Sequence, residues 1–259
     1  MTKLPDDIQG FLIDLSGVLY VDNAIIPGAI ETLELLRKRN VPVRFCTNTT
    51  VLSDVSLLAK LAALGLPIEP HQLFGAVRAA VTYLRKRGAP RCHLFLSDDP
   101  LRDFAEFPTD DARPEFVVIG DMGKNWDYEM MQRAFHMVIA GAEIVALHKG
   151  RYWQTQAGLQ MDIGAFVAGL EYVTGKTATV IGKPSPDFFG LAVQDMNLPA
   201  GAVAMVGDDI NSDIGGAQAA GLKGILVRTG KYRPDLAASS TIVPDLTIDS
   251  IADLAGLFS

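Results

Sequence analysis

The stretch Gly10-Phe11-Leu12-Ile13-Asp14-Leu15-Ser16-Gly17-Val18-Leu19-Tyr20 sets the pattern from which the fold is predicted. Its apolar residues lead into Asp14, a Ser-Gly pair interrupts them, and a second apolar pair follows. We predict a short buried strand that ends in a carboxylate, at the edge where open α/β sheets bind their ligands. An aspartate that merely caps the next turn gives the same local pattern, so the choice depends on the rest of the chain.

The composition bounds the class of protein. The chain has 259 residues, of which 49% are apolar, so it can bury a full core as one large domain or two smaller ones. A net charge of −7 argues against nucleic acid or an anionic membrane as the main partner. Residues 1–10 are not expected to act as a secretory signal, and no apolar run in the sequence has the length expected of a bilayer span. Cys46 and Cys92 are expected to be reduced core thiols, as in a cytoplasmic protein.

Amphipathic helices alternate with short apolar strands in the first part of the chain. The expected helices cover residues 29–39, 53–64 and 76–87, and a second strand covers residues 41–48. Ser53 has the side chain of a helix N-cap, and Gly65 is typical of a helix end. This alternation predicts an α/β fold with a doubly wound, Rossmann-like parallel sheet.

The pattern changes in the middle of the chain and then resumes. A polar stretch with three prolines, at 100, 108 and 114, separates strands expected over residues 93–97, 116–119 and 144–147, with helices over 128–140 and 164–174. Further strands are expected over 179–182, 202–206 and 224–227, and helices over 186–197 and 211–220. We therefore predict a discontinuous core of residues 1–75 and 182–259, with residues 76–181 forming an inserted α/β domain.

Polar residues follow four of the predicted strands. They are Asp14, the pair Thr47-Asn48, Lys183, and the pair Asp208-Asp209 with Asp213 shortly after it. Because the ends of parallel strands share one edge of a sheet, these residues are expected to line one pocket. An acidic cluster with oxygen ligands suits Mg²⁺, and a lysine with a hydroxyl and an amide suits a phosphate group. Each residue alone has a structural explanation, such as a cap or a surface charge, but their shared position indicates a phosphate site.

With these motifs in place, the chain resembles the haloacid dehalogenase superfamily of phosphatases. The matching stretches are Asp14-Leu15-Ser16-Gly17-Val18, Cys46-Thr47-Asn48, Gly182-Lys183-Pro184, and Gly207-Asp208-Asp209 with Asp213. The insertion has the position of the superfamily's type-2 cap. Further stretches, Lys149-Gly150-Arg151-Tyr152 and Gly215-Gly216-Ala217-Gln218, are similar to one subgroup of subfamily IIA.

The resemblance implies a role for each site residue. Asp14 would attack phosphorus and form an aspartyl-phosphate. Mg²⁺ would lie between the Asp14 carboxylate, the Ser16 backbone carbonyl and Asp208. Thr47, Asn48 and Lys183 would hold the phosphate oxygens, with Asp14 and Ser16 beside them. Asp209 and Asp213 would lie behind the metal ligands, where Asp213 would orient a metal-bound water or Lys183.

Ser16 departs from the superfamily pattern, which has a second aspartate at this position. A hydroxyl is a poor general acid near neutral pH, so the departure predicts a preference for leaving groups that depart readily, such as pyrophosphate or the phosphoramidates phospholysine and phosphohistidine. One alternative is a general sugar- or nucleotide-phosphate phosphatase with the same residues. Another is a phosphate- or phosphoprotein-binding module that has lost turnover. The sequence does not show which group activates the hydrolytic water.

The substrate-facing residues of the cap are expected at Lys149, Arg151 and Tyr152, beside Trp153. Such a basic and aromatic cluster could meet an anionic leaving group, whereas a surface charge pair beside a half-buried ring is the alternative. The expected partner is a small phosphorylated molecule and possibly a phosphoprotein. Because relatives of this kind often dimerise through the cap, the resemblance also implies a possible homodimer formed through the cap.

Overall fold

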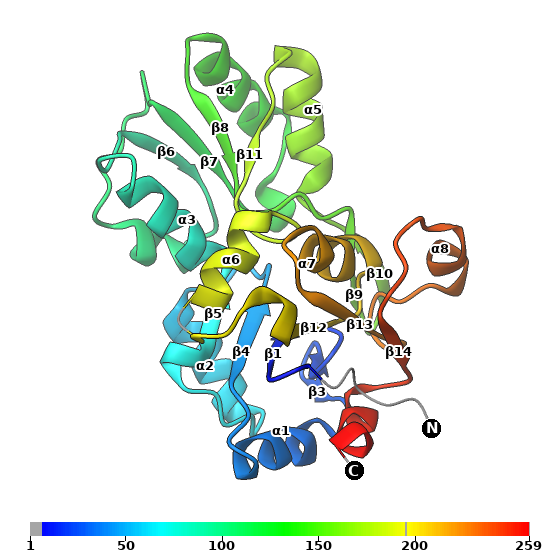
Figure 1. The fold of residues 1–259 in the computed structure, drawn as a ribbon. Coiled ribbons are helices and arrows are strands. Elements are labelled where there is room, and N and C mark those ends of the chain that lie inside the picture. Colours follow the sequence, from blue (N-terminus) through cyan, green and yellow to red (C-terminus); the bar gives the residue numbers. More distant parts are fainter. Residues whose placement is uncertain (1–6, 195, 259) are drawn as a thin grey trace.

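The computed structural model of the protein describes residues 7–194 and 196–258. Its main sheet has six parallel strands in the order β14-β13-β12-β1-β4-β5 (Figure 1). These strands are β1 (Gly10–Asp14), β4 (Val43–Thr47), β5 (Leu73–Gly75), β12 (Val203–Gly207), β13 (Lys223–Val227) and β14 (Leu246–Ile248). The predicted doubly wound α/β fold is therefore confirmed. Within the described ranges, no helix combines the length and the apolar character that a bilayer crossing requires.

Strand β1 lies at the centre of this sheet, between β12 and β4. All five of its residues are buried, because strands flank it on both sides and helices cover both faces of the sheet. Ile13 is paired with Val206 of β12, and Asp14 with Cys46 of β4. Since both pairings are parallel, the carboxyl ends of the three strands meet at one edge, and Asp14 lies in the middle of it.

Helices cover the two faces of the main sheet. One face packs against α1 (Ala29–Lys38), α2 (Asp54–Ala63) and the 3₁₀ helix η6 (Ile251–Phe258). The other packs against α3 (Ala76–Arg85), α6 (Pro186–Gln194) and α7 (Gly216–Ala219). Helix α2 begins as expected at Ser53, whose side chain accepts a hydrogen bond from Ser56 N at 3.2 Å.

A second sheet lies beyond the carboxyl edge of the first, and we call residues 76–180, which form it, the cap (Figure 1). It has four parallel strands in the order β11 (Thr179–Val180), β8 (Glu143–Ala146), β7 (Phe116–Ile119) and β6 (Cys92–Phe95). Helices α4 (Tyr128–Ile139) and α5 (Gly164–Thr174) cover one face. The opposite face shares a continuous apolar core with α3, α6 and the main sheet, so the two sheets pack as one body.

Two hairpins and several short helices complete the chain. The hairpins are β2 (Tyr20–Val21) with β3 (Ala24–Ile25), and β9 (Tyr152–Thr155) with β10 (Gly158–Met161). The short helices are η1 (Pro70–Gln72), η2 (Pro100–Phe104), η3 (Gly123–Asn125), η4 (Ala200–Ala202), η5 (Ile210–Gly215) and α8 (Pro234–Ser239). The tip of the β9–β10 hairpin reaches the core, where Gln156 N donates a hydrogen bond to Asp22 Oδ2 at 2.8 Å.

The structure adds elements that the sequence patterns did not predict. Both hairpins fall in this group, as do β5 and β14, because these short strands lack the continuous buried apolar run that marks a strand such as β7. The helix predicted over residues 211–220 instead begins with η5, a wide π-type helix, and continues as α7. The side chain of Asp209 caps η5 by accepting hydrogen bonds from Asn211 N and Ser212 N.

Candidate active site

Three carboxylates meet at the carboxyl edge of the main sheet. Asp14 ends β1, Asp208 directly follows β12, and Asp213 lies in η5. All three are buried, and one oxygen of each lies within 4.8 Å of the others. Since like charges this close repel one another, such a cluster requires cations.

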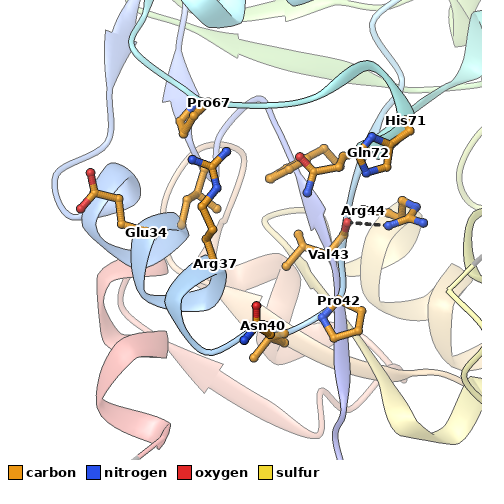
Figure 2. A pocket seen from close by; sticks show the side chains of 12 residues that line it. Glu34, Arg37, Asn40, Pro42, Val43, Arg44, Pro67, His71 and Gln72 are labelled. Atoms are coloured by element: carbon orange, nitrogen blue, oxygen red, sulfur yellow. Dashed lines mark hydrogen bonds between the residues drawn. The ribbon is translucent and has the colours of Figure 1, made fainter.

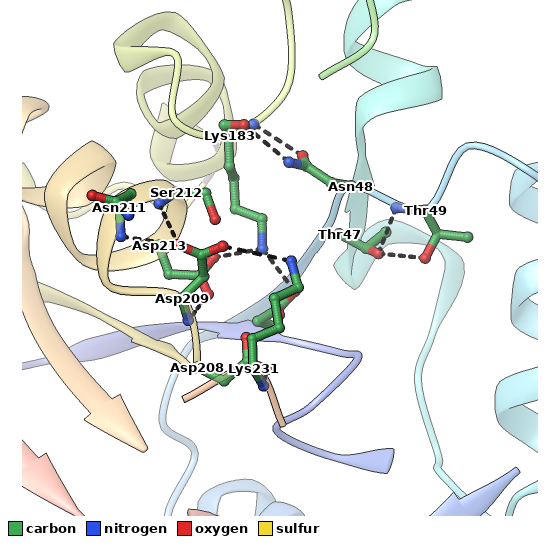
Figure 3. Close-up of polar contacts among 11 residues, drawn as sticks. Thr47, Asn48, Thr49, Lys183, Asp208, Asp209, Asn211, Ser212, Asp213 and Lys231 are labelled. Carbon is green, nitrogen blue, oxygen red and sulfur yellow. Dashed lines mark hydrogen bonds and ion pairs between the residues drawn. The ribbon is translucent and has the colours of Figure 1, made fainter. Parts of the chain in front are cut away.

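Lys183 supplies one of these cations (Figure 3). Its side chain is 3% exposed, and its Nζ lies 2.7 Å from Asp14 Oδ1 and 2.7 Å from Asp213 Oδ1. Burial alone would lower the pKa of this ammonium group, but the charges of Asp14 and Asp213 hold the pKa above its usual value. Lys183 is therefore charged at neutral pH and bridges the strand-end carboxylate to η5.

The backbone of Lys183 is held by Asn48, which follows β4. The Asn48 side chain accepts a hydrogen bond from Lys183 N at 3.0 Å and donates one to Lys183 O at 2.9 Å. The preceding residue is also fixed, because Gly182 N donates to the carbonyl of Leu147 in the cap at 2.7 Å. The segment that carries the lysine is thus tied to both the core and the cap.

Asp208 lies between two glycines that leave no room for a side chain. A Cβ added at Gly17 would lie 1.9 Å from Asp208 Oδ2, and one added at Gly230 would lie 2.0 Å from it. Both glycines have positive φ angles, of 90° and 58°. Oδ2 accepts a hydrogen bond from Lys231 N at 2.6 Å, whereas Oδ1 is buried without a partner among the described residues.

Burial and mutual repulsion raise the pKa values of Asp208 and Asp213. Burial, with the charge of Asp14 adding to it, raises the pKa of Asp208 well above its usual range. Burial also raises the pKa of Asp213 to about 6, although the Lys183 ammonium opposes that effect. Keeping all three acids ionised therefore requires more positive charge than Lys183 alone supplies.

The donor set fits a divalent cation. Asp14, Asp208 and Asp213 offer carboxylate oxygens within 4.8 Å of one another, and oxygen ligands are those that Mg²⁺ prefers. Asp208 Oδ1 is buried with no donor among the described residues, as expected for an atom that a cation would satisfy. Asp213 has less capacity to bind a cation, because Lys183 Nζ and Asp209 N already contact its two oxygens.

The remaining predicted core residues surround this cluster. Thr47 Oγ1 donates to Thr49 Oγ1 at 2.9 Å and accepts from Thr49 N at 3.0 Å, which fixes the turn after β4. Asp209 caps η5 through Oδ1, and its Oδ2 lies 3.6 Å from Lys231 Nζ. Asp209 is thus occupied by a cap and an ion pair beside the cluster.

A pocket of about 340 Å³ opens above the cluster, between the core and the cap. Its walls include five of the predicted core residues: Asp14, Ser16, Thr47, Asn48 and Lys183. The edge of one parallel sheet and the cap together form a concave site with charged groups at its base, which is the usual form of a small-molecule active site.

Lys149, Arg151 and Tyr152, the cap residues expected to face the substrate, do not line this pocket. Lys149 forms an ion pair with Glu171 of α5, and Arg151 is exposed. Tyr152 instead contributes to a smaller depression beside Asp208 and α8. Within residues 149–153 of the cap, Gly150 and Trp153 are the residues that line the pocket.

The pocket also contains residues that sequence reasoning missed. From the core come Tyr20, Asp22, Lys60 and Lys231, and from the cap come Asp121, His148 and Asp162. Asp121 and His148 do follow β7 and β8 closely, so the rule that selected Asp14 could have found them had it been applied to the cap sheet. Lys60 lies in α2, Asp162 follows β10, and neither has a distinctive local pattern.

A second pocket, of about 320 Å³, lies near the opposite ends of the core strands (Figure 2). It is lined by α1 and the start of β4, including Arg37, Val43 and Arg44, together with His71. None of the predicted site residues borders it. The chemistry indicated by the sequence therefore belongs to the pocket between core and cap.

Comparison with family models and curated proteins agrees with this site. Residues 11–107 match the family described as haloacid dehalogenase-like hydrolase, and residues 180–254 match the HAD-hydrolase-like family. The chain is 40% identical to haloacid dehalogenase-like hydrolase domain-containing protein 2 of Bos taurus, over 94% of this chain and 93% of that protein. It is 36% identical to phospholysine phosphohistidine inorganic pyrophosphate phosphatase of Homo sapiens, over 96% and 94% of the two chains.

Solved structures of similar fold are also phosphatases or related proteins. A 4-nitrophenylphosphatase from Thermotoga maritima superposes with a TM-score of 0.89 at 28% identity, covering 97% of each chain. NagD from E. coli superposes with a TM-score of 0.84 at 26% identity, covering 95% of this chain and 98% of that one. The likeness extends over the core and the cap together.

Proposed function

The chain belongs to the haloacid dehalogenase-like hydrolases and is a phosphatase, and from this premise we propose that it is a magnesium-dependent phosphohydrolase acting through an aspartyl-phosphate. The observation that best supports this proposal is the position of Asp14. Its buried carboxylate borders the pocket, forms an ion pair with Lys183 and lies near Asp208 Oδ1, which has no hydrogen-bond partner among the described residues. A nucleophile, a fixed cation and a cation-binding acid thus lie together.

Asp14 is the nucleophile in this proposal. Lys183 Nζ donates a hydrogen bond to Asp14 Oδ1, and no described residue donates to Oδ2. We therefore assign Oδ2 as the oxygen that attacks phosphorus. As the new P–O bond forms, the bond to the leaving group breaks and its electron pair departs with that group. Water then adds to phosphorus, the aspartyl bond breaks, and inorganic phosphate leaves while the Asp14 carboxylate is restored.

The residues around Asp14 bind the phosphoryl group. Lys183, Thr47 and the backbone of Asn48 contact its oxygens, where negative charge is spread in the transition state. Asp14, the Ser16 carbonyl and Asp208 would hold Mg²⁺, with Asp213 orienting Lys183 and Asp209 fixing η5 beside them. When bound, Mg²⁺ supplies Lewis-acid neutralisation of the phosphoryl charge.

Ser16 directs the substrate preference. Its side chain lines the pocket but cannot protonate a leaving group near neutral pH. The enzyme therefore prefers small substrates whose leaving group departs readily, such as pyrophosphate or the phosphoramidates phospholysine and phosphohistidine. The name of the human relative, phospholysine phosphohistidine inorganic pyrophosphate phosphatase, supports this preference.

The test is phosphate release from pyrophosphate, imidodiphosphate, para-nitrophenyl phosphate and a sugar phosphate, with Mg²⁺ and with a chelator. We expect Mg²⁺-dependent release that is fastest for the first two. The Asp14→Asn variant should lose roughly a thousandfold or more, because an amide is a poor nucleophile. The control is Asp187→Asn, which changes an exposed residue of α6 and should retain activity.

A different result would contradict each of the three claims, which are the Mg²⁺ dependence, the nucleophile and the substrate preference. Equal release with and without Mg²⁺ would refute the metal dependence, and full activity of Asp14→Asn would refute the nucleophile. Faster release from the sugar phosphate would instead indicate a general sugar- or nucleotide-phosphate phosphatase.

A further inference from the structure

The cap wall of the pocket carries two carboxylates, Asp121 and Asp162. The Asp162 side chain is 9% exposed, and its Oδ1 accepts a hydrogen bond from Ile163 N at 2.8 Å. Asp121 Oδ1 accepts one from Gly123 N at 2.7 Å. In the described part of the chain, no lysine or arginine forms an ion pair with either carboxylate. Both therefore line the pocket without a cationic partner.

His148 lies beside Asp162 but does not neutralise it. Its Nδ1 accepts a hydrogen bond from Gly150 N at 3.1 Å, which leaves the proton of a neutral ring on Nε2. Nε2 is 3.7 Å from Asp162 Oδ1, too far for a hydrogen bond. Burial lowers the pKa of His148, although Asp162 and Asp121 oppose this and Lys231 adds to it. The ring is therefore uncharged at neutral pH.

The cationic side chains at the pocket contact groups of the core. Lys60 Nζ lies 4.7 Å from the centre of the Tyr20 ring, and the charge of Asp22 also acts on it. Lys183 is paired with two carboxylates of the reaction centre, and Lys231 contacts Asp209. Asp121 and Asp162 are therefore the cap-wall carboxylates without a lysine or arginine partner among the described residues, and the 37% exposed ring of Trp153 lines the same pocket.

We propose that Asp162, with Asp121, is a specificity-determining residue that accepts a positively charged part of the leaving group. A carboxylate pair beside an aromatic ring suits an ammonium group and repels a second anion. This inference rests on the proposed function, since it concerns the leaving-group side of the same pocket. Among leaving groups that depart readily, it favours amine-bearing molecules over pyrophosphate.

Three aryl phosphates with para-aminoethyl, para-ethyl and para-carboxyethyl groups provide the test. They differ in remote charge while their phenol leaving groups are alike. We expect kcat/KM of the wild type to be on the order of tenfold higher for the cationic compound than for the neutral one, and lowest for the anionic one, as a charge pair in a partly shielded pocket predicts. Asp162→Asn should reduce this preference to about threefold or less.

Asp111→Asn is the matched control. It alters the carboxylate of another Asp–His pair in the cap, beside His93, which does not border the pocket. Should Asp162→Asn fail to fold by circular dichroism, Asp121→Asn tests the same charge effect. An unchanged preference in a folded Asp162→Asn protein, or no preference in the wild type, overturns the inference.

Failure of the proposed function is a separate result. In that case the wild type would hydrolyse none of the three compounds with Mg²⁺. Calorimetric binding of the same compounds would then still measure the charge preference, and tighter binding of the anionic compound would refute it.

Discussion

At position 183, a lysine side chain is almost completely buried and its charge is balanced by Asp14 and Asp213. A buried charge is tolerated only when partners replace the water that it has lost. Here the partners come from different elements, β1 and η5, so one ammonium group orients the Asp14 carboxylate and fixes the helix that follows β12. This explains why a lysine, rather than a neutral donor, occupies the position.

Ser16 leads to a prediction at the same scale. Ser16→Asp should place a carboxyl group beside Asp14, where it can protonate a departing oxygen. Since general acid catalysis contributes about 100-fold or more, we expect the rate for an alkyl monophosphate to rise at least about tenfold relative to pyrophosphate. The measurement is kcat/KM for both substrates.

Ser212→Asp is the control for added negative charge, because Ser212 also lines the pocket but lies in η5. An equal rise in both variants, or none in Ser16→Asp, would show that the leaving group is not limited by proton transfer at position 16.

Among the elements, the turn after β13 has a direct effect on the carboxylate cluster. Thr229 Oγ1 donates to Gly17 O at 2.5 Å, Lys231 N donates to Asp208, and Gly230 packs against the Asp208 carboxylate. The turn thereby joins the loop after β1 to the end of β12. It holds Asp208 in place through backbone groups, without a conspicuous sequence motif.

Gly230→Ala is predicted to damage the cation site. The added Cβ would lie 2.0 Å from Asp208 Oδ2 and 2.5 Å from Gly17 Cα, so the carboxylate must move. We expect the Mg²⁺ concentration for half-maximal activity to rise at least about tenfold, because a displaced ligand weakens binding. Magnesium titration of phosphate release measures this effect.

Gly88→Ala is the control that distinguishes the steric clash with Asp208 from the strain of a positive φ angle. Gly88 also has a positive φ, of 83°, but a Cβ there meets nothing within 4 Å. The positive φ alone should cost each variant on the order of 1 kcal/mol of stability, and only Gly230→Ala adds a steric clash. If Gly88→Ala shifts the Mg²⁺ requirement as much, the effect of Gly230→Ala does not come from Asp208.

For the molecule as a whole, the core and the cap are joined by a continuous apolar cluster and by polar contacts between them. These contacts include Asp121 N to Thr50 Oγ1 at 2.9 Å and Ser53 N to Asp99 Oδ2 at 2.7 Å. Arg233 Nη2 also donates to Gln154 Oε1 in the β9–β10 hairpin at 2.5 Å. The buried acids lie where these units meet, so their ionisation affects the stability of the whole chain.

Stability should depend on pH and Mg²⁺ together. The pKa of Asp213 is raised to about 6 by burial, so the folded chain holds a proton that the unfolded chain loses nearer pH 4. This group therefore destabilises the metal-free fold as pH rises from about 4 to about 6, and its proton hinders cation binding below about pH 6. We expect Mg²⁺ to raise Tm by several degrees at about pH 7.5 and by less than half as much at about pH 5.

Thermal unfolding with Mg²⁺ and with a chelator at both pH values measures this dependence. Asp208→Asn is the comparison, since removing one acid should raise the metal-free Tm and diminish the response to Mg²⁺. An equal response to Mg²⁺ at both pH values would contradict the raised pKa values as the cause.

Much of the fold was accessible from local pattern. The apolar run before Asp14, the N-cap at Ser53 and the alternation of helices and strands depend on residues close together in the chain, and they correctly indicated a doubly wound sheet. The same rule brought Asp14, Thr47-Asn48 and Lys183 to one pocket. The short edge strands and the wide start of η5 were missed, because long-range pairing and the cap at Asp209 determine them.

The sequence by itself determined the family, the sheet and the meeting of Asp14, Thr47-Asn48 and Lys183 at one pocket, because strand ends in a parallel sheet converge whatever covers them. Only the tertiary structure decided which cap residues line the pocket. Lys149 turns to Glu171 and Arg151 is exposed, while His148 and Asp162 line the pocket. The physical reason is that these directions depend on the docking of the cap against the core, between residues far apart in the chain, which no local period records.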